Sequence, residues 1–321
     1  GIGVAVITSW CGTPAPDDAG EAAIIEVPVQ TVVSMSTSFL PHLTAQGVLD
    51  RVVAVDTALY SSNEALIERV AAGEVAEVGG GGGGTEVNIE TLIDLQPGLI
   101  LTQRFDDSDT SYPAIQQAGL PVAIAADFLD TSPLGLAEWG KFISLFFNTE
   151  AIAEASYDEV QNNYESLATL AKSAADAPTV FAGTPFDGTW YMPGGASYLA
   201  TLIRDAGGDY LWADDESTGS LFLDFETVLD TAVDANYWLN IYQSTTDDVL
   251  ALDERLSGFA AFQNGQLYTN NARSNANGGS DYYETGYARP DWLLADLVSI
   301  FHPDLLPDHE LYFYKPLQAA S

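Results

Sequence analysis

The longest uninterrupted amphipathic stretch of the chain covers residues 149–174, close to its middle. This stretch contains neither proline nor glycine. Its apolar side chains recur at helical spacing and would share one face: Ile152, Val160, Tyr164, Leu167 and Ala171. Acidic and amide side chains fall on another face, and Pro178 ends the segment. The pattern predicts a helix of roughly 35–40 Å, which is longer than an average helix of a globular protein.

Short apolar runs typical of buried strands alternate with helical patterns on both sides of this stretch. Strands are expected at residues 30–35, 51–56, 99–102, 121–125, 179–182, 237–241 and 266–269. Alternating strands and helices predict mainly parallel sheets that carry helices on both faces. The expected fold class is therefore α/β.

Two segments of the chain repeat one pattern of helix, turn and strand. They are residues 88–102 and residues 224–240, and each places a Glu-Thr pair at the same point, Glu90-Thr91 and Glu226-Thr227. An internal repeat of this kind indicates duplicated lobes. A chain of 321 residues also exceeds one typical core. Two Rossmann-like lobes joined by the long central helix are the expected architecture.

The domain boundaries follow from this pattern. Residues 1–26 are expected to be a signal remnant and tether, residues 27–148 the N-terminal lobe, residues 149–176 the inter-lobe helix, and residues 177–321 the C-terminal lobe. Within the last of these, residues 304–314 are expected to form a tail on the surface.

The charge balance excludes some classes of partner. The chain has 10 Lys and Arg against 46 Asp and Glu, a formal net charge of −36. Such a surface repels nucleic acids and anionic lipids. Two readings remain open, a protein solvated in strong salt or an acidic surface for a cationic partner.

The single cysteine, Cys11, excludes a disulfide framework. It follows an apolar run and precedes a small, acidic stretch, as does the lipidated cysteine at the end of a lipoprotein signal peptide. Lipidation of Cys11 is therefore one expectation. An ordinary secretory segment cut elsewhere and an incomplete N-terminus are the alternatives.

Motifs for catalysis, metal or nucleotide binding are weak. The six glycines at residues 79–84 are not followed by the lysine of a phosphate loop, so a flexible loop is expected. The histidines, His42, His302 and His309, have neither metal-ligand spacing nor an evident nucleophile beside them. No enzyme, no metal site and no cofactor are predicted.

Candidate ligand-binding residues follow the expected strands, because ligands of open α/β sheets bind beyond the carboxyl ends of the strands. They combine aromatic, hydroxyl and amide groups with two arginines: Ser36, Thr37, Ser38, Tyr60, Arg104, Phe105, Phe128, Phe186, Trp190, Tyr191, Trp212, Asn271, Arg273 and Tyr283. The set suits a large, rigid, partly apolar ligand. Arg104 and Arg273 could pair with carboxylate or catecholate oxygens. The alternatives are aromatic side chains packed under loops and arginines paired with surface acids.

These features together resemble a known family. Residues 30–56, 88–102, 180–195 and 202–212, with the central helix, are similar to ABC-importer substrate-binding proteins of the group that carries ferric siderophores, cobalamin and haem. The resemblance spans roughly residues 27–301.

The resemblance implies two lobes on one helix, a ligand cleft between them, and a surface glutamate in each lobe that docks on arginines of an ABC permease. By position in the repeat these are Glu90 and Glu226. The alternative for both is an ordinary carboxylate at a helix N-terminus. The family resemblance further implies a periplasmic or extracytoplasmic monomer, with Cys11 as its expected lipid anchor.

The function expected is capture of a ferric-siderophore-type iron complex and its delivery to the permease. Cobalamin or haem is the alternative cargo, with Tyr191 or Tyr283 as a possible haem ligand. A secreted two-lobed hydrolase is the hypothesis from another class, and a nucleophile beside a base would distinguish it.

Overall fold

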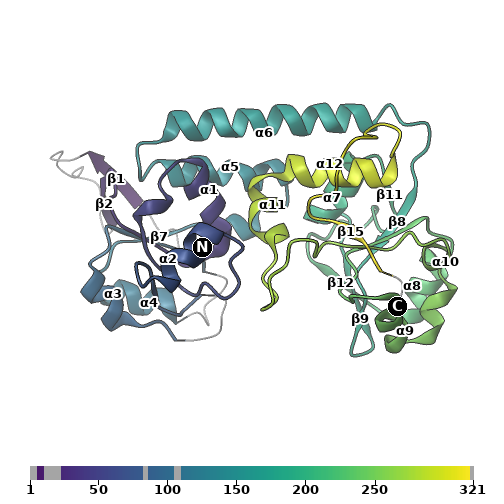
Figure 1. Ribbon diagram of the computed structural model, residues 1–321, viewed down its shortest axis with the longest axis horizontal. Coiled ribbons are helices and arrows are strands. Elements are labelled where there is room, and N and C mark those ends of the chain that lie inside the picture. Colours follow the sequence, from purple (N-terminus) through teal and green to yellow (C-terminus); the bar gives the residue numbers. More distant parts are fainter. Residues whose placement is uncertain (1–5, 11–22, 82–85, 105–109, 319–321) are drawn as a thin grey trace. The chain divides into compact units, whose positions relative to one another are not determined.

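The computed structural model describes residues 6–10, 23–81, 86–104 and 110–318, which form two compact units (Figure 1). Unit 1 contains Gly1–Leu129, Leu136–Glu159 and Asn275–Ala288, and unit 2 contains Asp130–Gly135, Val160–Ser274 and Arg289–Ser321. The units differ from the continuous segments expected from the sequence. Asp130–Gly135 belongs to unit 2 although its neighbours in the chain belong to unit 1, and Asn275–Ala288 belongs to unit 1 although its neighbours belong to unit 2.

Unit 1 is built on a five-stranded parallel sheet of order β5-β4-β3-β6-β7. Its strands are β3 (Val32–Ser34), β4 (Val52–Val55), β5 (Ala76–Glu77), β6 (Leu99–Thr102) and β7 (Val122–Ile124). Neighbouring residues of a strand face opposite sides of a sheet. Val32 accordingly belongs to one hydrophobic cluster and Val33 to another, so both faces of this sheet are covered.

Five short helices belong to unit 1, and local sequence signals mark the start of α2 and the end of α1. They are α1 (Leu40–Ala45), α2 (Glu64–Ala71), α3 (Ile89–Leu95), α4 (Ser111–Gln117) and α11 (Thr285–Ala288), with short 3-10 turns at Thr37–Phe39, Leu49–Arg51, Asp127–Leu129 and Asp281–Tyr283. Asn63 caps α2 by accepting from the Leu66 amide at 3.0 Å, as an N-cap side chain does. Gly47 follows α1 with φ 70°, a conformation that favours glycine.

The N-terminal part of the chain differs from the expected tether. Strand β1 (Val6–Trp10) pairs in parallel with β2 (Ala23–Val27). Ile25 is buried in the core of unit 1. The fold therefore includes residues assigned to the tether, while Cys11 lies outside the described residues.

Unit 2 contains a three-stranded parallel sheet of order β11-β8-β13, from β8 (Thr179–Ala182), β11 (Asp209–Tyr210) and β13 (Tyr237–Leu239). It also contains two antiparallel sheets that the sequence did not predict. One is β12-β10-β9, from β9 (Pro185–Phe186), β10 (Thr189–Pro193) and β12 (Ser220–Leu223), and the other pairs β14 (Tyr268–Thr269) with β15 (Lys315–Pro316). Asp187 and Gly188 join β9 to β10 with φ 49° and 76°, as a tight two-residue hairpin requires.

The remaining elements of unit 2 are α7 (Tyr198–Asp205), α8 (Phe225–Ala232), α9 (Thr246–Leu252), a 3-10 helix at Glu254–Gly258, α10 (Ala260–Gln263) and α12 (Pro290–Phe301). The expected surface tail at residues 304–314 is wrong at its end, where Phe313 and Tyr314 are buried, whereas Asp304 and Asp308 are exposed. The buried carboxylate of Asp296, on α12, accepts hydrogen bonds from the backbone amides of Tyr312, Phe313 and Tyr314. This polar anchor fixes the segment in the core.

The predicted long helix is confirmed as α6 (Glu150–Ala171), which begins in unit 1 and ends in unit 2. Val160, Tyr164 and Ala171 are buried on it as expected, whereas Ile152 is 49% exposed. The preceding helix α5 (Pro133–Ser144) also crosses between the units. No helix in the described part of the chain has the length and apolar character needed to cross a bilayer.

Candidate functional site

In unit 1 the strand-end residues form a polar network around one buried carboxylate. Asp127 follows β7, and its two oxygens accept from Ser38 Oγ at 2.7 Å and from Gln103 Nε2 at 2.6 Å. Ser36 caps the turn that carries Ser38, and Thr37 is half-buried beside it. Burial raises the pKa of Asp127 above its ordinary value. Three strand ends are thus joined at one edge of the sheet.

A second group of strand-end residues in unit 1 involves a segment from late in the chain. Asn275 Nδ2 donates to the carbonyls of Leu59 and Ser61, both at 3.1 Å. Glu284 accepts from Ser61 Oγ at 3.3 Å and from the Ser62 amide at 2.7 Å. These contacts hold the segment Asn275–Ala288 against the loop that follows β4.

Two tyrosines selected from the sequence, Tyr60 and Tyr283, come from that loop and that segment. Both are exposed. The Tyr283 ring also contacts Tyr287 edge-on, with centroids 5.8 Å apart. Unit 1 therefore presents aromatic as well as polar groups beyond its strands.

Three further candidates from the sequence belong to unit 1: Arg104, Phe105 and Phe128. The Arg104 guanidinium lies 5.5 Å from the centroid of the Tyr112 ring, and Phe128 is half-buried. Phe105 and residues 82–84 of the glycine run lie outside the described residues.

Unit 2 presents an exposed aromatic face on its hairpin sheet, formed by Phe186, Tyr191 and Phe222. Phe186 and Phe222 are 74% and 73% exposed, and Tyr191 is 45% exposed. Tyr191 and Phe222 are register partners on β10 and β12, and their ring centroids lie 5.4 Å apart. These side chains give the hairpin sheet of unit 2 an exposed aromatic patch. Phe222 was not selected from the sequence, since only its antiparallel pairing places it beside Tyr191.

Trp190 is a correction to the predicted ligand site. Its side chain is fully buried among Phe181, Trp238 and Phe259. Its indole Nε1 donates to the Ala182 carbonyl at 2.9 Å. Because alternate residues of a strand face opposite sides, Trp190 fills the core while its neighbour Tyr191 faces outward.

The remaining candidates in unit 2 have separate surroundings. Trp212 is half-buried, with its ring 6.2 Å from that of Tyr210. The exposed Arg273 places its guanidinium 4.3 Å from the centroid of the Tyr312 ring.

Buried polar atoms follow strands β13 and β14. Within the described part of the chain, four side-chain atoms here have no hydrogen-bond partner: Gln243 Oε1, Thr269 Oγ1, Asn270 Nδ2 and Asn271 Oδ1. Buried polar groups are normally paired, and leaving one unpaired costs about 1–3 kcal/mol. These four atoms are enclosed by the protein and keep unused hydrogen-bonding capacity.

Glu90 and Glu226 occupy matching places in the two units. Each lies in the first turn of its helix and is exposed, Glu90 on α3 and Glu226 on α8. Asn88 caps α3 by accepting from the Thr91 amide at 3.0 Å, and Asp224 caps α8 by accepting from the Thr227 amide at 2.7 Å. The repeat seen in the sequence is therefore a repeat of local structure.

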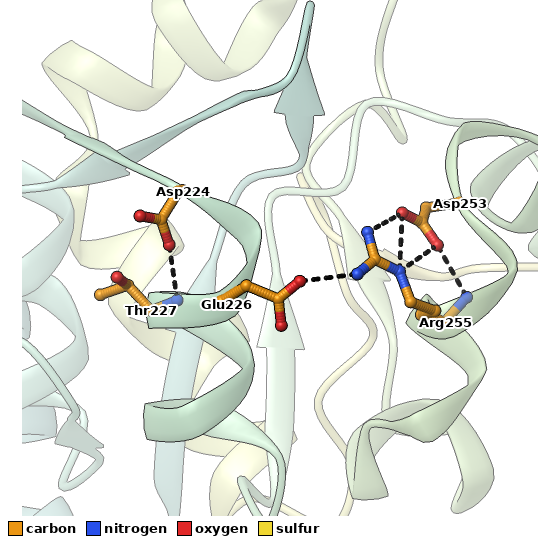
Figure 2. Close-up of polar contacts among 5 residues, drawn as sticks. All are labelled: Asp224, Glu226, Thr227, Asp253 and Arg255. Atoms are coloured by element: carbon orange, nitrogen blue, oxygen red, sulfur yellow. Dashed lines mark hydrogen bonds and ion pairs between the residues drawn. The ribbon is translucent and has the colours of Figure 1, made fainter.

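The two glutamates differ in one contact. Figure 2 shows Glu226 Oε1 accepting from Arg255 Nη1 at 2.7 Å, while the same guanidinium is held by Asp253. Among the described residues Glu90 has no ion pair. An exposed pair of this kind contributes about 0–1 kcal/mol of stability.

The structure defines the surroundings of His42 and His309. His42 is buried, and burial lowers its pKa to about 4, so its imidazole is neutral at physiological pH. His309 Nε2 is hydrogen-bonded to Asp296 at 2.7 Å. Within the ranges that the structure describes, no three His, Cys, Asp or Glu side chains are grouped to hold a metal ion.

Comparison with known proteins agrees with this arrangement. An uncharacterized lipoprotein of Methanocaldococcus jannaschii is 24% identical over 303 residues, which cover 91% of this chain and 69% of the relative. A possible iron-binding (periplasmic solute-binding) protein of Staphylococcus epidermidis has a similar fold, with TM-score 0.68, 16% identity and coverage of 86% of this chain and 99% of the other. The periplasmic heme-binding protein RhuT of Roseiflexus gives TM-score 0.66, 19% identity and coverage of 86% and 99%.

The α/β class, the two units and the helix that joins them are therefore confirmed. The model of the periplasmic binding protein family matches residues 32–273. Its members bind substrates and do not catalyse reactions, so the hydrolase hypothesis is dropped. By this match, which covers most of its length, the chain belongs to the periplasmic binding protein family.

Proposed function

We propose that this protein captures a ferric-siderophore-type iron complex outside the cytoplasm and delivers it to an ABC permease. The observation that carries the proposal is the exposed aromatic face of Phe186, Tyr191 and Phe222 in a member of a substrate-binding family. Exposed aromatic rings on a rigid hairpin supply a large contact area for a rigid, partly apolar ligand.

Polar groups beyond the strands complement the aromatic face. In unit 2 the unpaired atoms of Thr269, Asn270 and Asn271 have hydrogen-bonding capacity, and in unit 1 Ser36 and Tyr60 remain accessible. Arg104 and Arg273 would attract anionic oxygens of the complex, although each guanidinium also lies against a tyrosine ring. Orientation by a few polar groups on an aromatic surface is typical of small-molecule sites.

Ligand titration tests the cargo. Quenching of tryptophan fluorescence by ferrichrome, ferric enterobactin, cyanocobalamin and haemin should be saturable for one of the two ferric siderophores. The variant Tyr191→Ala should weaken that binding, while Ile152→Ala, on the exposed face of α6, serves as the matched control. Absence of saturable binding to all four compounds would contradict the proposal.

Cobalamin or haem remains the second candidate cargo, and the haem reading has one specific observation behind it. Tyr191 and Tyr283 are exposed phenols, and tyrosine can serve as an axial haem ligand. If haemin binds, Tyr191→Phe and Tyr283→Phe should separate ligation from stacking, because phenylalanine keeps the ring and removes the oxygen.

Delivery is proposed to depend on Glu90 and Glu226 as docking carboxylates. Their matched positions and exposure support the role, and the ion pair with Arg255 leaves Glu226 Oε2 without a bond among the described residues. Charge reversal to Lys at both positions should abolish uptake and leave ligand affinity unchanged. A loss of ligand affinity would show that the two glutamates belong to the ligand site instead.

Anchoring through Cys11 is also proposed. Two relatives from Methanocaldococcus jannaschii are named as lipoproteins, and Cys11 is the single cysteine of this chain. Expression of the full chain and of Cys11→Ser, followed by membrane fractionation, tests the anchor. Equal membrane retention of both forms would overturn it.

A further inference from the structure

Unit 2 contains a cavity that is separate from the strand-end residues. Its volume is about 620 Å³, which is in the range of small-molecule sites. Leu167 and Leu170 line it from α6, and Trp292 and Ala295 line it from α12. The segment after α12 supplies the remaining wall, including Tyr312. None of the ligand residues selected from the sequence lines this cavity.

The aromatic wall of the cavity is held in place by buried polar contacts. Trp292 and Tyr312 meet edge-on with ring centroids 5.0 Å apart. Arg289 lies 4.3 Å above the Trp292 ring, and its guanidinium is fixed by the buried Asp291 at 2.6 and 2.9 Å. Asp296 fixes the backbone amide of Tyr312 at 2.9 Å. The wall is therefore preformed, which lowers the cost of binding.

Most hydrogen-bond donors of the lining are already engaged. Asn163 Nδ2 donates to Asp291 at 3.2 Å, Ser166 Oγ donates to the Asn162 carbonyl at 2.6 Å, and His309 Nε2 is bonded to Asp296. Asn163 Oδ1 and the Glu310 carboxylate, by contrast, have no partner in the described part of the chain. The Trp292 indole N–H and the second Asn163 N–H can still donate, while Glu310 gives the lining a carboxylate that no cation in the described part of the chain neutralises.

We propose that this cavity is a second ligand site, which binds a small molecule with an apolar body and an amine. The body would lie against Leu167, Leu170 and the two rings, and the ammonium would donate to Glu310 and Asn163. Among the lining residues Glu310 carries the negative charge without a cationic partner, so an ammonium complements it and a carboxylate is repelled. This site is independent of the proposed iron cargo.

Three probes that differ only in their polar end test the proposal: phenylbutylamine, phenylbutanol and phenylbutyrate. Calorimetric titration of the full chain in about 0.15 M KCl, where the Debye length is about 8 Å, screens long-range attraction to the acidic surface and leaves a contact ion pair in place. The amine should bind with one-to-one stoichiometry and more tightly than the alcohol, and the carboxylate should bind least. Equal affinity for all three would overturn the assignment.

Two kinds of variant locate the binding. Leu170→Trp and Leu167→Trp each fill the cavity and should abolish amine binding, and thermal unfolding identifies any variant that is not folded. Glu310→Gln should weaken the amine about fivefold and leave the alcohol unchanged, as expected for a partly exposed charge pair. Glu254→Gln, an exposed acid outside the cavity, is the matched control. Amine binding that survives in both folded tryptophan variants would place the amine elsewhere.

Discussion

At the scale of single residues, neighbours on one strand have opposite roles. Trp190 closes the core of unit 2 and Tyr191 contributes to its exposed aromatic face. The sequence predicted aromatic residues after β8 but not which of them face outward. Which side chains of β10 face outward is set by the hairpin and by pairing with β12, which begins 27 residues after β10 ends. Local pattern cannot show a partner so distant in the chain.

The first prediction separates these two roles. Trp190→Phe removes the indole hydrogen bond to Ala182 and part of the packing, so the free energy of unfolding should fall by roughly 1–3 kcal/mol. Tyr191→Ala should change it by less than about 0.5 kcal/mol, as surface substitutions do, and should weaken ligand binding. Denaturant unfolding and ligand titration measure both. The reverse outcome would place Trp190 in the ligand site.

The second prediction concerns Glu284, a buried acid that accepts hydrogen bonds from Ser61 and Ser62. Burial raises the pKa of Glu284 from 4.5 to about 7. The folded state therefore binds the proton more tightly than the unfolded state, and its stabilisation is complete below pH 4.5 and lost as pH rises through 7. Glu284→Gln should remove this loss, so the variant should gain roughly 2–3 kcal/mol relative to the native protein between pH 5 and pH 8.

Thermal unfolding across that pH range tests the effect of Glu284. Glu68→Gln, an exposed acid on α2, is the control, and its difference from the native protein should not depend on pH. A Glu284→Gln difference that is equally flat would mean that the carboxyl titrates normally.

At the scale of elements, the sequence predicted helices well and antiparallel pairing poorly. The starts of α3, α7 and α8 follow from Asn88, Ser197 and Asp224, whose side chains accept from amides in the first turn. Such signals are local. Strands β12 and β15 lack a local signal, because each is short and is held by a partner from another part of the chain.

The third prediction concerns α6, which like α5 enters both units. Asn162 is exposed near its middle, and Asn162→Pro removes a backbone hydrogen bond and places the ring against the preceding turn. The free energy of unfolding should fall by about 3 kcal/mol or more, with loss of helical circular dichroism. Asn162→Ala, which keeps the helix, is the control. A proline variant as stable as the control would show that α6 does not support the fold.

At the scale of the whole molecule, the two units and the family could be predicted from the sequence. The inclusion of Asn275–Ala288 in unit 1 could not. Asn275–Ala288 joins unit 1 through contacts such as Glu284 to Ser61, which are 223 residues apart. Nothing in the residues around position 284 indicates that distant partner. The same exchange explains why the aromatic residues of unit 1 include Tyr283, which the expected boundaries assign to the other lobe.

The last prediction concerns the acidity of the molecule. With a net charge of −36, the folded chain repels itself, and only 10 cationic side chains offset this. Exposed acids occur in both units, for example Glu64 and Glu68 in unit 1 and Asp230 and Asp234 in unit 2. This distribution favours adaptation of the whole surface to salt over a patch for one cationic partner.

Raising KCl from about 0.1 M to about 1 M shortens the Debye length from about 10 Å to about 3 Å. The midpoint of thermal unfolding should therefore rise by several degrees, and an uncharged osmolyte at equal osmolality should produce a smaller rise. A midpoint that stays constant or falls with KCl would mean that ion pairs such as Arg255 with Glu226, which salt also screens, outweigh the repulsion.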